Sequence, residues 1–348
     1  MAKDKSVKPI MTFQAALADA GEKPHLLLGN GFSIALKPDI FSYSSLFDEC
    51  IKQKCISPQA MKVFKKFNTK DFEIVIRSLN DASRVLSAYK KDRSLNGQLI
   101  RDAKAIKETL VKLLSSKHPE NPSQITEQQY LGCIKFLTTF GIIYTLNYDL
   151  LLYWVIMKAL EADPHRYDDG FRNEEGEDYV VWYPERSERQ NVYYLHGALH
   201  LFDAGAEIRK FTWNRTGINL MKQIKGQLEQ NSFPLFVAEG TSKEKMTRVN
   251  HSAYLGRGVR SFAKIGGSLF VYGHSLAEND SHYLSLLAKN KVEKLFISIF
   301  DDGSSKQKNT NDTIRQRAEA IATARAQLKE GYPIEVYYYD ATSAKVWG

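Results

Sequence analysis

The stretch HLLLGNGFS, residues 25–33, predicts the element around which the rest of the chain is organised. Its apolar start predicts a buried strand, and its two glycines, one residue apart, predict a tight turn. The apolar residues 34–36 are suited to open a helix. A strand, a glycine turn and a helix start together direct backbone N–H groups at a phosphate. An ordinary tight turn is the alternative interpretation, because Ile34 stands where the dinucleotide fingerprint has its third glycine.

The composition favours a folded protein with a substantial core, because 43% of the 348 residues are hydrophobic. The lysine-rich start lacks the apolar segment of a secretion signal, and polar residues interrupt the longest apolar stretch, 142–160. We therefore expect a cytoplasmic protein with no membrane span. The three cysteines form no C-x-x-C pair, so we expect neither disulfides nor a metal site.

Positive charge is concentrated in one part of the chain. Residues 51–118 hold 16 Lys and Arg against 6 Asp and Glu, a net charge of +10, while the whole chain has a net charge of +8. This basic block is a candidate surface for nucleic acid or for an acidic partner. The alternative, which the sequence favours, is that its helices carry lysines on their solvated faces.

Apolar runs alternate with amphipathic segments along most of the chain, which indicates an α/β fold. We expect a Rossmann-like, mostly parallel sheet with helices on both faces, within a single domain over residues 1–348. Residues 40–140 have helical periodicity and form a block inserted between the first two strands. Residues 161–190 form a loop-rich excursion with one hairpin strand at 179–183. The remaining strands are predicted at 141–146, 192–195, 233–238, 268–272, 294–300 and 334–339.

Capping residues and breaks in the pattern predict where helices begin and end. Asp71 is placed to cap a helix that begins at Phe72, and Thr126 with Gln129 forms a capping box. A polar, mobile loop is expected over residues 301–310. Beyond the inserted block, helices are expected at 150–160, 216–230, 243–263, 280–288 and 314–329.

The predicted strands repeatedly end in polar or glycine-bearing turns. Because the carboxyl ends of parallel strands share one edge of the sheet, these turns should converge on a ligand site. Glycine turns can approach a phosphate, amides and carboxylates can bind ribose hydroxyls, and a histidine can move a proton near neutral pH. The turns are Gly29-Asn30-Gly31-Phe32-Ser33, Asn147-Tyr148-Asp149, His196-Gly197, Glu239-Gly240-Thr241-Ser242 and Gly273-His274-Ser275.

The motifs GNGFS, TLNYD, LHG and YGHS, followed by Asp280, occur in an order that resembles the sirtuin superfamily. More closely, the chain resembles the bacterial sirtuin-like family of NAD-consuming anti-phage defence proteins. The segments LHGALHLF (195–202) and VAEGTSK (237–243) also resemble a branch described mainly as a domain of unknown function. The resemblance covers about residues 24–300. The chain departs from sirtuins in having Asn30 between its glycines and in lacking the four-cysteine zinc module.

The resemblance implies that NAD is the substrate and that the bond between nicotinamide and ribose is cleaved through an oxocarbenium-like transition state. It implies that Asn147 orients the ribose and the attacking water and that His196 is the general base. Asp149 would contact the nicotinamide side or fix its loop. The residues expected to bind NAD are Gly29, Gly31 and Ser33 at the phosphate, Asn30 between the two glycines, Phe32 over the ribose, and Gly273, Ser275 and Asp280 around the adenosine half.

Each of these residues also has an ordinary structural interpretation. Asn147 or Asp149 could cap the helix that follows, and His196 could belong to a plain turn at a strand end. His200 and His274 are expected to be structural rather than catalytic.

The leading hypothesis is an NAD+ hydrolase that releases nicotinamide and ADP-ribose and depletes NAD during phage infection. The resemblance implies a homo-oligomer or a separate partner, such as a HerA-like ATPase. The alternatives are a non-catalytic subunit that binds NAD or ADP-ribose, an NAD-dependent protein deacylase, and a nucleic-acid-binding protein that uses the basic block. The missing zinc module disfavours the deacylase, because that module helps to frame the peptide groove.

Overall fold

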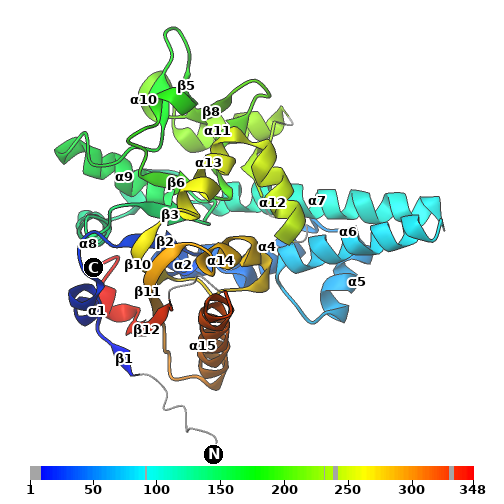
Figure 1. Cartoon of the computed structure of the whole chain (residues 1–348). Helices are drawn as coiled ribbons and strands as arrows, with labels where there is room; N and C mark the ends of the chain where they lie inside the picture. Colours follow the sequence, from blue (N-terminus) through cyan, green and yellow to red (C-terminus); the bar gives the residue numbers. More distant parts are fainter. Residues whose placement is uncertain (1–8, 91, 231, 238–241, 329–332) are drawn as a thin grey trace, which may run out of the picture.

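The main sheet has seven strands that all run parallel, in the order β1-β12-β11-β10-β2-β3-β6 (Figure 1). The computed structural model describes residues 9–90, 92–230, 232–237, 242–328 and 333–348. The strands of this sheet are β1 (Ile10–Met11), β2 (His25–Leu28), β3 (Ile143–Thr145), β6 (Val192–Tyr194), β10 (Gly266–Tyr272), β11 (Lys291–Ile299) and β12 (Glu335–Asp340).

The strand order confirms the predicted Rossmann-like class. Apart from the two-residue edge strand β1, the strands counted along the chain lie in the order 3-2-1-4-5-6, which is the Rossmann order. The direction of winding reverses between β2 and β10, which pair with Leu26 opposite Phe270. In such sheets, ligands bind at this switch point, outside the carboxyl ends of the strands.

Helices cover both faces of the parallel sheet, as the sequence predicts. Leu26 pairs with both Phe270 and Ile143, so the next residue on β3, Tyr144, points to the face opposite Phe270. Phe270 packs against the first helix of the chain, and Tyr144 packs against the helix Ala253–Phe262 on the other face. The helices outside the inserted block are α1 (Phe13–Ala20), α2 (Gly31–Leu36), α9 (Leu151–Ala162), α10 (Trp213–Thr216), α11 (Leu220–Glu229), α12 (Ser242–His251), α13 (Ala253–Phe262), α14 (Ser281–Leu287) and α15 (Ser305–Ala326).

The inserted block is helical, as predicted, and two of its helices extend away from the sheet. Figure 1 shows α6 and α7 side by side in an arm that projects from the body of the molecule. Asp71 caps α6, and Thr126 with Gln129 forms the expected capping box at α8. The block consists of α3 (Pro38–Phe41), α4 (Tyr43–Gln53), α5 (Pro58–Lys66), α6 (Phe72–Ala88), α7 (Arg93–Lys117) and α8 (Glu127–Leu137).

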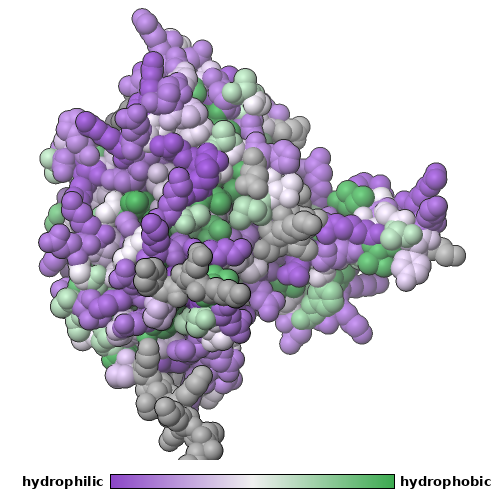
Figure 2. Space-filling view, viewed as in Figure 1, coloured by the Kyte–Doolittle hydropathy of each residue, from purple (hydrophilic) through white to green (hydrophobic). Residues whose placement is uncertain are grey.

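The surface in view is mostly hydrophilic, and the arm carries apolar side chains among its charged ones (Figure 2). Val85, Tyr89 and Ile100, on or next to the arm helices, are at least half exposed. None of the described helices combines the length and the apolar character needed to cross a bilayer.

A second, antiparallel sheet was not predicted. Residues 161–190 carry two strands of it, and the strand predicted at 233–238 belongs to it instead of the parallel sheet. The chain changes sheets at Gly197, whose φ of 83° ends the direction of β6. A side chain there would meet the Leu235 carbonyl, so glycine allows the two backbones to approach. In sheet order the strands are β4 (Phe171–Asn173), β5 (Tyr179–Trp182), β8 (Ile208–Phe211), β7 (Gly197–Asp203) and β9 (Pro234–Phe236).

Three helix boundaries differ from the prediction because of local caps. The segment 243–263 forms two helices, since Ser252 accepts a hydrogen bond from the Leu255 N–H and starts α13. The expected loop at 301–310 becomes helical from residue 305, because Ser304 caps α15. The helix predicted from residue 216 begins at α11, after the N-cap Asn219. Glu239, Gly240 and Thr241 of the predicted polar turn lie outside the described residues.

Candidate functional site

The two glycine turns at the switch point touch each other directly. The Gly31 N–H donates to the Gly273 carbonyl at 2.7 Å, and the Gly29 N–H donates to the Tyr272 carbonyl at 2.9 Å. A Cβ on Gly31 would lie 2.5 Å from the Gly273 Cα, and Gly273 itself has a φ of 67°. The glycines are therefore required by the packing of turn on turn. Two N–H groups predicted to face a phosphate are already bonded to backbone carbonyls.

The other residues of these turns are also engaged within the protein. Phe32 is completely buried and packs on Trp347, with ring centroids 4.8 Å apart. The sequence predicted that the Phe32 ring would lie over a bound ribose, but in this structure the ring belongs to the core. Asn30 donates from Nδ2 to the Phe41 carbonyl at 3.0 Å. The Ser275 carbonyl accepts a hydrogen bond from an arginine of α15.

Ser33, Asn147 and Asp149 form a closed group that we call the serine cluster. The Ser33 hydroxyl donates to Asp149 Oδ2 at 2.5 Å and accepts from Asn147 Nδ2 at 3.1 Å. Asp149 Oδ1 accepts from the Leu151 N–H at 2.8 Å. All three side chains are buried. Asp149 thus fixes its own loop and the start of α9, which is one of the two roles that the resemblance left open.

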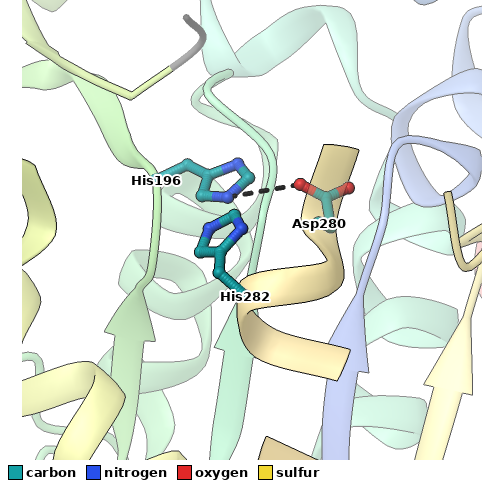
Figure 3. Close-up of side chains that lie close together, drawn as sticks. All are labelled: His196, Asp280 and His282. Atoms are coloured by element: carbon teal, nitrogen blue, oxygen red, sulfur yellow. Dashed lines mark ion pairs between the residues drawn. The ribbon is translucent and has the colours of Figure 1, made fainter. Parts of the chain in front are cut away.

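His196, His274, Asp280 and His282 form a second group, the histidine cluster. His196 follows β6, and its Nε2 lies 3.5 Å from Asp280 Oδ1 (Figure 3). His274 Nε2 lies 2.9 Å from Asp280 Oδ2. The rings of His196 and His282 stack with centroids 5.6 Å apart. Asp280 was predicted to face the adenosine half, but the structure brings it to the predicted general base.

The tautomer of His196 follows from its hydrogen bonds. The Tyr148 hydroxyl donates to the Val237 carbonyl at 2.8 Å, so its oxygen accepts from His196 Nδ1–H at 3.3 Å. His196 Nε2 then carries a lone pair and faces the Asp280 carboxylate. Both His196 Nε2 and Asp280 Oδ1 are buried and have no hydrogen-bond partner among the described residues. Such atoms mark a place where a water, a proton or a ligand group would bind.

Burial and charge set the protonation of this pair. Burial holds the pKa of His196 well below its usual value, although the Asp280 carboxylate opposes the shift. The imidazole is therefore neutral at pH 7 and able to accept a proton. Burial acts to raise the pKa of Asp280, but the hydrogen bond from His274 and the charge of Lys245 hold it below its usual range.

Lys245 of α12 completes the surroundings of Asp280. Its ammonium lies 3.8 Å from Asp280 Oδ1 and 2.8 Å from Glu73 Oε2 of the inserted block. Burial opposes its charge, but the carboxylates of Glu73 and Asp280 raise the pKa of Lys245. The lysine therefore stays protonated.

His196, Asp280 and His282 also deserve a test as metal ligands. Within the described ranges, they form the one group of three or more His, Cys, Asp or Glu residues whose donor atoms all lie within 4.8 Å of one another. Two imidazoles and a carboxylate suit zinc or iron. Asp280 Oδ1, however, already faces the Lys245 ammonium at 3.8 Å. A dication bound to the same oxygen would be repelled by that charge, so the cluster suits proton transfer better.

Sequence reasoning found His196 and Asp280 but missed three of their neighbours. Glu73 and Lys245 are far apart in the chain and follow no motif, so nothing in the sequence marked them. His282 follows Asp280 by two residues, and this spacing could have drawn attention to it. His274 was expected to be structural, and it lies against Asp280.

The strand order defines a Rossmann-like α/β protein, and the polar carboxyl edge of its parallel sheet is the candidate site. The family of a domain of unknown function, DUF4917, matches residues 26–347, and the chain belongs to this family. A comparison with curated proteins found no match.

Proposed function

We propose that the protein binds NAD at the carboxyl edge of its parallel sheet and hydrolyses the bond between nicotinamide and ribose. The observation that carries the proposal is the pair of buried atoms at this edge, His196 Nε2 and Asp280 Oδ1, which lie 3.5 Å apart and have no hydrogen-bond partner in the described part of the chain. The pair lies at the edge where Rossmann-like sheets bind dinucleotides. The choice of NAD cleavage among dinucleotide reactions rests on the sirtuin-like order of motifs.

In the proposed reaction, His196 Nε2 takes a proton from a water molecule as that water attacks the anomeric carbon of the ribose. The C–N bond to nicotinamide breaks, and its electron pair neutralises the pyridinium nitrogen. The products are ADP-ribose, nicotinamide and a proton, which His196 later releases to solvent. Asp280 stabilises the imidazolium that forms, because an opposite charge within about 4–6 Å favours the charged form. The resemblance gives Asn147 the role of orienting the ribose, for which its Nδ2 would have to leave the Ser33 hydroxyl.

The test is incubation of the purified protein with NAD, with nicotinamide release followed by chromatography. Wild type should release nicotinamide, and His196→Ala should lower kcat by roughly 100-fold to 10,000-fold. His200→Ala is the matched control, because His200 is also buried but lies on β7 against Tyr153 and Tyr194. Full activity in His196→Ala would contradict the assignment of the base.

A second candidate function is a regulatory subunit that binds NAD or ADP-ribose without cleaving it. The observation that favours it is the burial of the candidate site residues, since His196 is 3% and Asn147 is 7% exposed. Calorimetry with NAD separates the two candidates, since the sensor predicts saturable binding with no nicotinamide release. We further propose, from the resemblance alone, that hydrolysis would serve NAD depletion in anti-phage defence. Loss of cellular NAD on infection would test this role.

A further inference from the structure

Lys245 is a buried charge that the proposed reaction does not use. Its side chain is 1% exposed, and the Glu73 side chain is 10% exposed. Burying an ammonium group has a large desolvation cost that an ion pair offsets only when its geometry is good. The partner, Glu73, stands in the first turn of α6. A charge pair thus links the inserted helical block to the helix that lies beside the histidine cluster.

We propose that Lys245, held by Glu73 of the inserted block, is a positioning residue that holds the Asp280 carboxylate against His196. This inference rests on the proposed function, which makes His196 the base and Asp280 its partner.

The two oxygens of Asp280 have different neighbours, and this difference supports the proposal. The Leu276 N–H donates to His274 Nδ1 at 3.0 Å, so His274 carries its proton on Nε2 and donates to Asp280 Oδ2. Oδ1 lies between Lys245 Nζ at 3.8 Å and His196 Nε2 at 3.5 Å. His274 therefore holds one oxygen, and the lysine is the fixed positive charge beside the oxygen that faces the base.

The same geometry makes the inserted block part of the site. Two carboxylates of the described residues, those of Glu73 and Asp280, lie within 4.0 Å of the Lys245 ammonium, and the closer is Glu73, at 2.8 Å. If α6 were displaced, the ammonium would lose this partner and would move toward Asp280 or out of the pair. From Glu73, α6 continues into the projecting arm (Figure 1), so the seating of the arm and the geometry of the base are coupled.

The first experiment compares the full-length protein with Lys245→Met, which has a similar volume and no charge. Burial raises the pKa of Glu73 to about 7 even beside the lysine, so this carboxyl can become neutral in the variant. We expect kcat for NAD hydrolysis to fall by roughly 10-fold to 100-fold with KM within about 3-fold of wild type. The matched control is Lys210→Met, which removes another buried lysine, paired with Asp169 at 2.5 Å on the second sheet. It should lower the melting temperature but leave kcat unchanged.

The double variant Glu73→Lys/Lys245→Glu separates positioning from structural support. It restores an ion pair between α6 and α12 but places a carboxylate beside Asp280. If Lys245 is a positioning residue, the double variant should have a higher melting temperature than Lys245→Met, but its kcat should stay as low. Recovery of both, or a Lys245→Met variant with normal kcat, would overturn the proposal.

Imidazole ¹⁵N chemical shifts or a crystal structure of Lys245→Met give a readout that does not depend on turnover. The expected result is a changed distance between Asp280 and His196, with the serine cluster unchanged. If wild type cleaves no NAD, the proposed function fails by itself. An unmoved Asp280 in the variant would overturn the positioning role in either case.

Discussion

The serine cluster and the histidine cluster lie at the same carboxyl edge, and each is built around one aspartate, the buried Asp149 and the partly buried Asp280. In the serine cluster, both oxygens of Asp149 accept hydrogen bonds, from Ser33 and from the Leu151 N–H. In the histidine cluster, Asp280 Oδ1 and His196 Nε2 face each other without a hydrogen-bond partner among the described residues. A closed network stabilises a fold, whereas an open one costs stability and is retained where a ligand or proton must bind.

The pKa values of the two aspartates are also shifted in opposite directions. Burial raises the pKa of Asp149, since its donors are a hydroxyl and backbone N–H groups that offset the burial only in part. Partial burial acts in the same direction on Asp280, but the hydrogen bond from His274 and the charge of Lys245 hold its pKa below the usual range. Two carboxyl groups whose surroundings separate their pKa values have different roles. We therefore expect Asp149 to be scaffold and Asp280 to be part of the reaction.

The largest effect should come from a substitution in the histidine cluster. Asp280→Asn removes the charge that stabilises the imidazolium, so kcat for NAD hydrolysis should fall by about 1,000-fold, or about 4 kcal/mol in activation free energy. Steady-state kinetics should show this loss, and urea denaturation should show a modest fall in the free energy of unfolding, because His274 and Lys245 lose a charged partner. The control is Asp149→Asn, for which we expect the reverse pattern. Equal losses of kcat in both variants would remove the distinction between the clusters.

A smaller effect should come from removing a hydrogen-bonding group from the serine cluster. Ser33→Ala leaves the buried Asp149 Oδ2 and Asn147 Nδ2 without the hydroxyl that joins them. The free energy of unfolding should fall by about 2 kcal/mol, because two buried polar atoms lose their partner. Urea denaturation measures this change. A large rise in KM for NAD with unchanged stability would instead return Ser33 to the phosphate-binding role predicted from the sequence.

A similar effect, which appears only on acidification, concerns His118, a buried histidine with both nitrogens engaged. Its Nε2 accepts from the Leu150 N–H at 3.0 Å, and its Nδ1 bonds the Pro119 carbonyl at 2.9 Å. Burial lowers the pKa of His118 to about 4. The unfolded chain, with a pKa of about 6.5, therefore binds the proton first as the pH falls.

Stability from His118 is thus fully present above about pH 6.5 and is lost as the pH falls toward 4. Between pH 7 and pH 5, wild type should lose about 2 kcal/mol more than His118→Gln, which keeps an acceptor but does not titrate. Denaturation curves at the two pH values measure the difference. Parallel losses in the two proteins would show that His118 is not the titrating group.

Most of the parallel sheet can be predicted from the sequence because its strands are local signals. Runs such as 25–28 and 268–272 are apolar, are bounded by glycine or polar turns, and alternate with amphipathic segments. The caps of α6 and α8 depend on residues within one turn of the helix start. The second sheet could not be predicted in the same way. Its strands β7 and β9 pair through residues far apart in the chain, and its short runs fit loops equally well.

The sequence by itself determined the fold class, the inserted helical block and the set of polar turns that end the strands. These features follow from local periodicity and from the rule that parallel strands share a carboxyl edge. Only the tertiary structure decided which of those residues meet. Asp280 lies against His196, and Lys245 meets Glu73 across 172 positions of chain. Contacts at such separation depend on how whole helices pack, and burial together with neighbouring charges and hydrogen bonds then shifts the pKa of each carboxyl group.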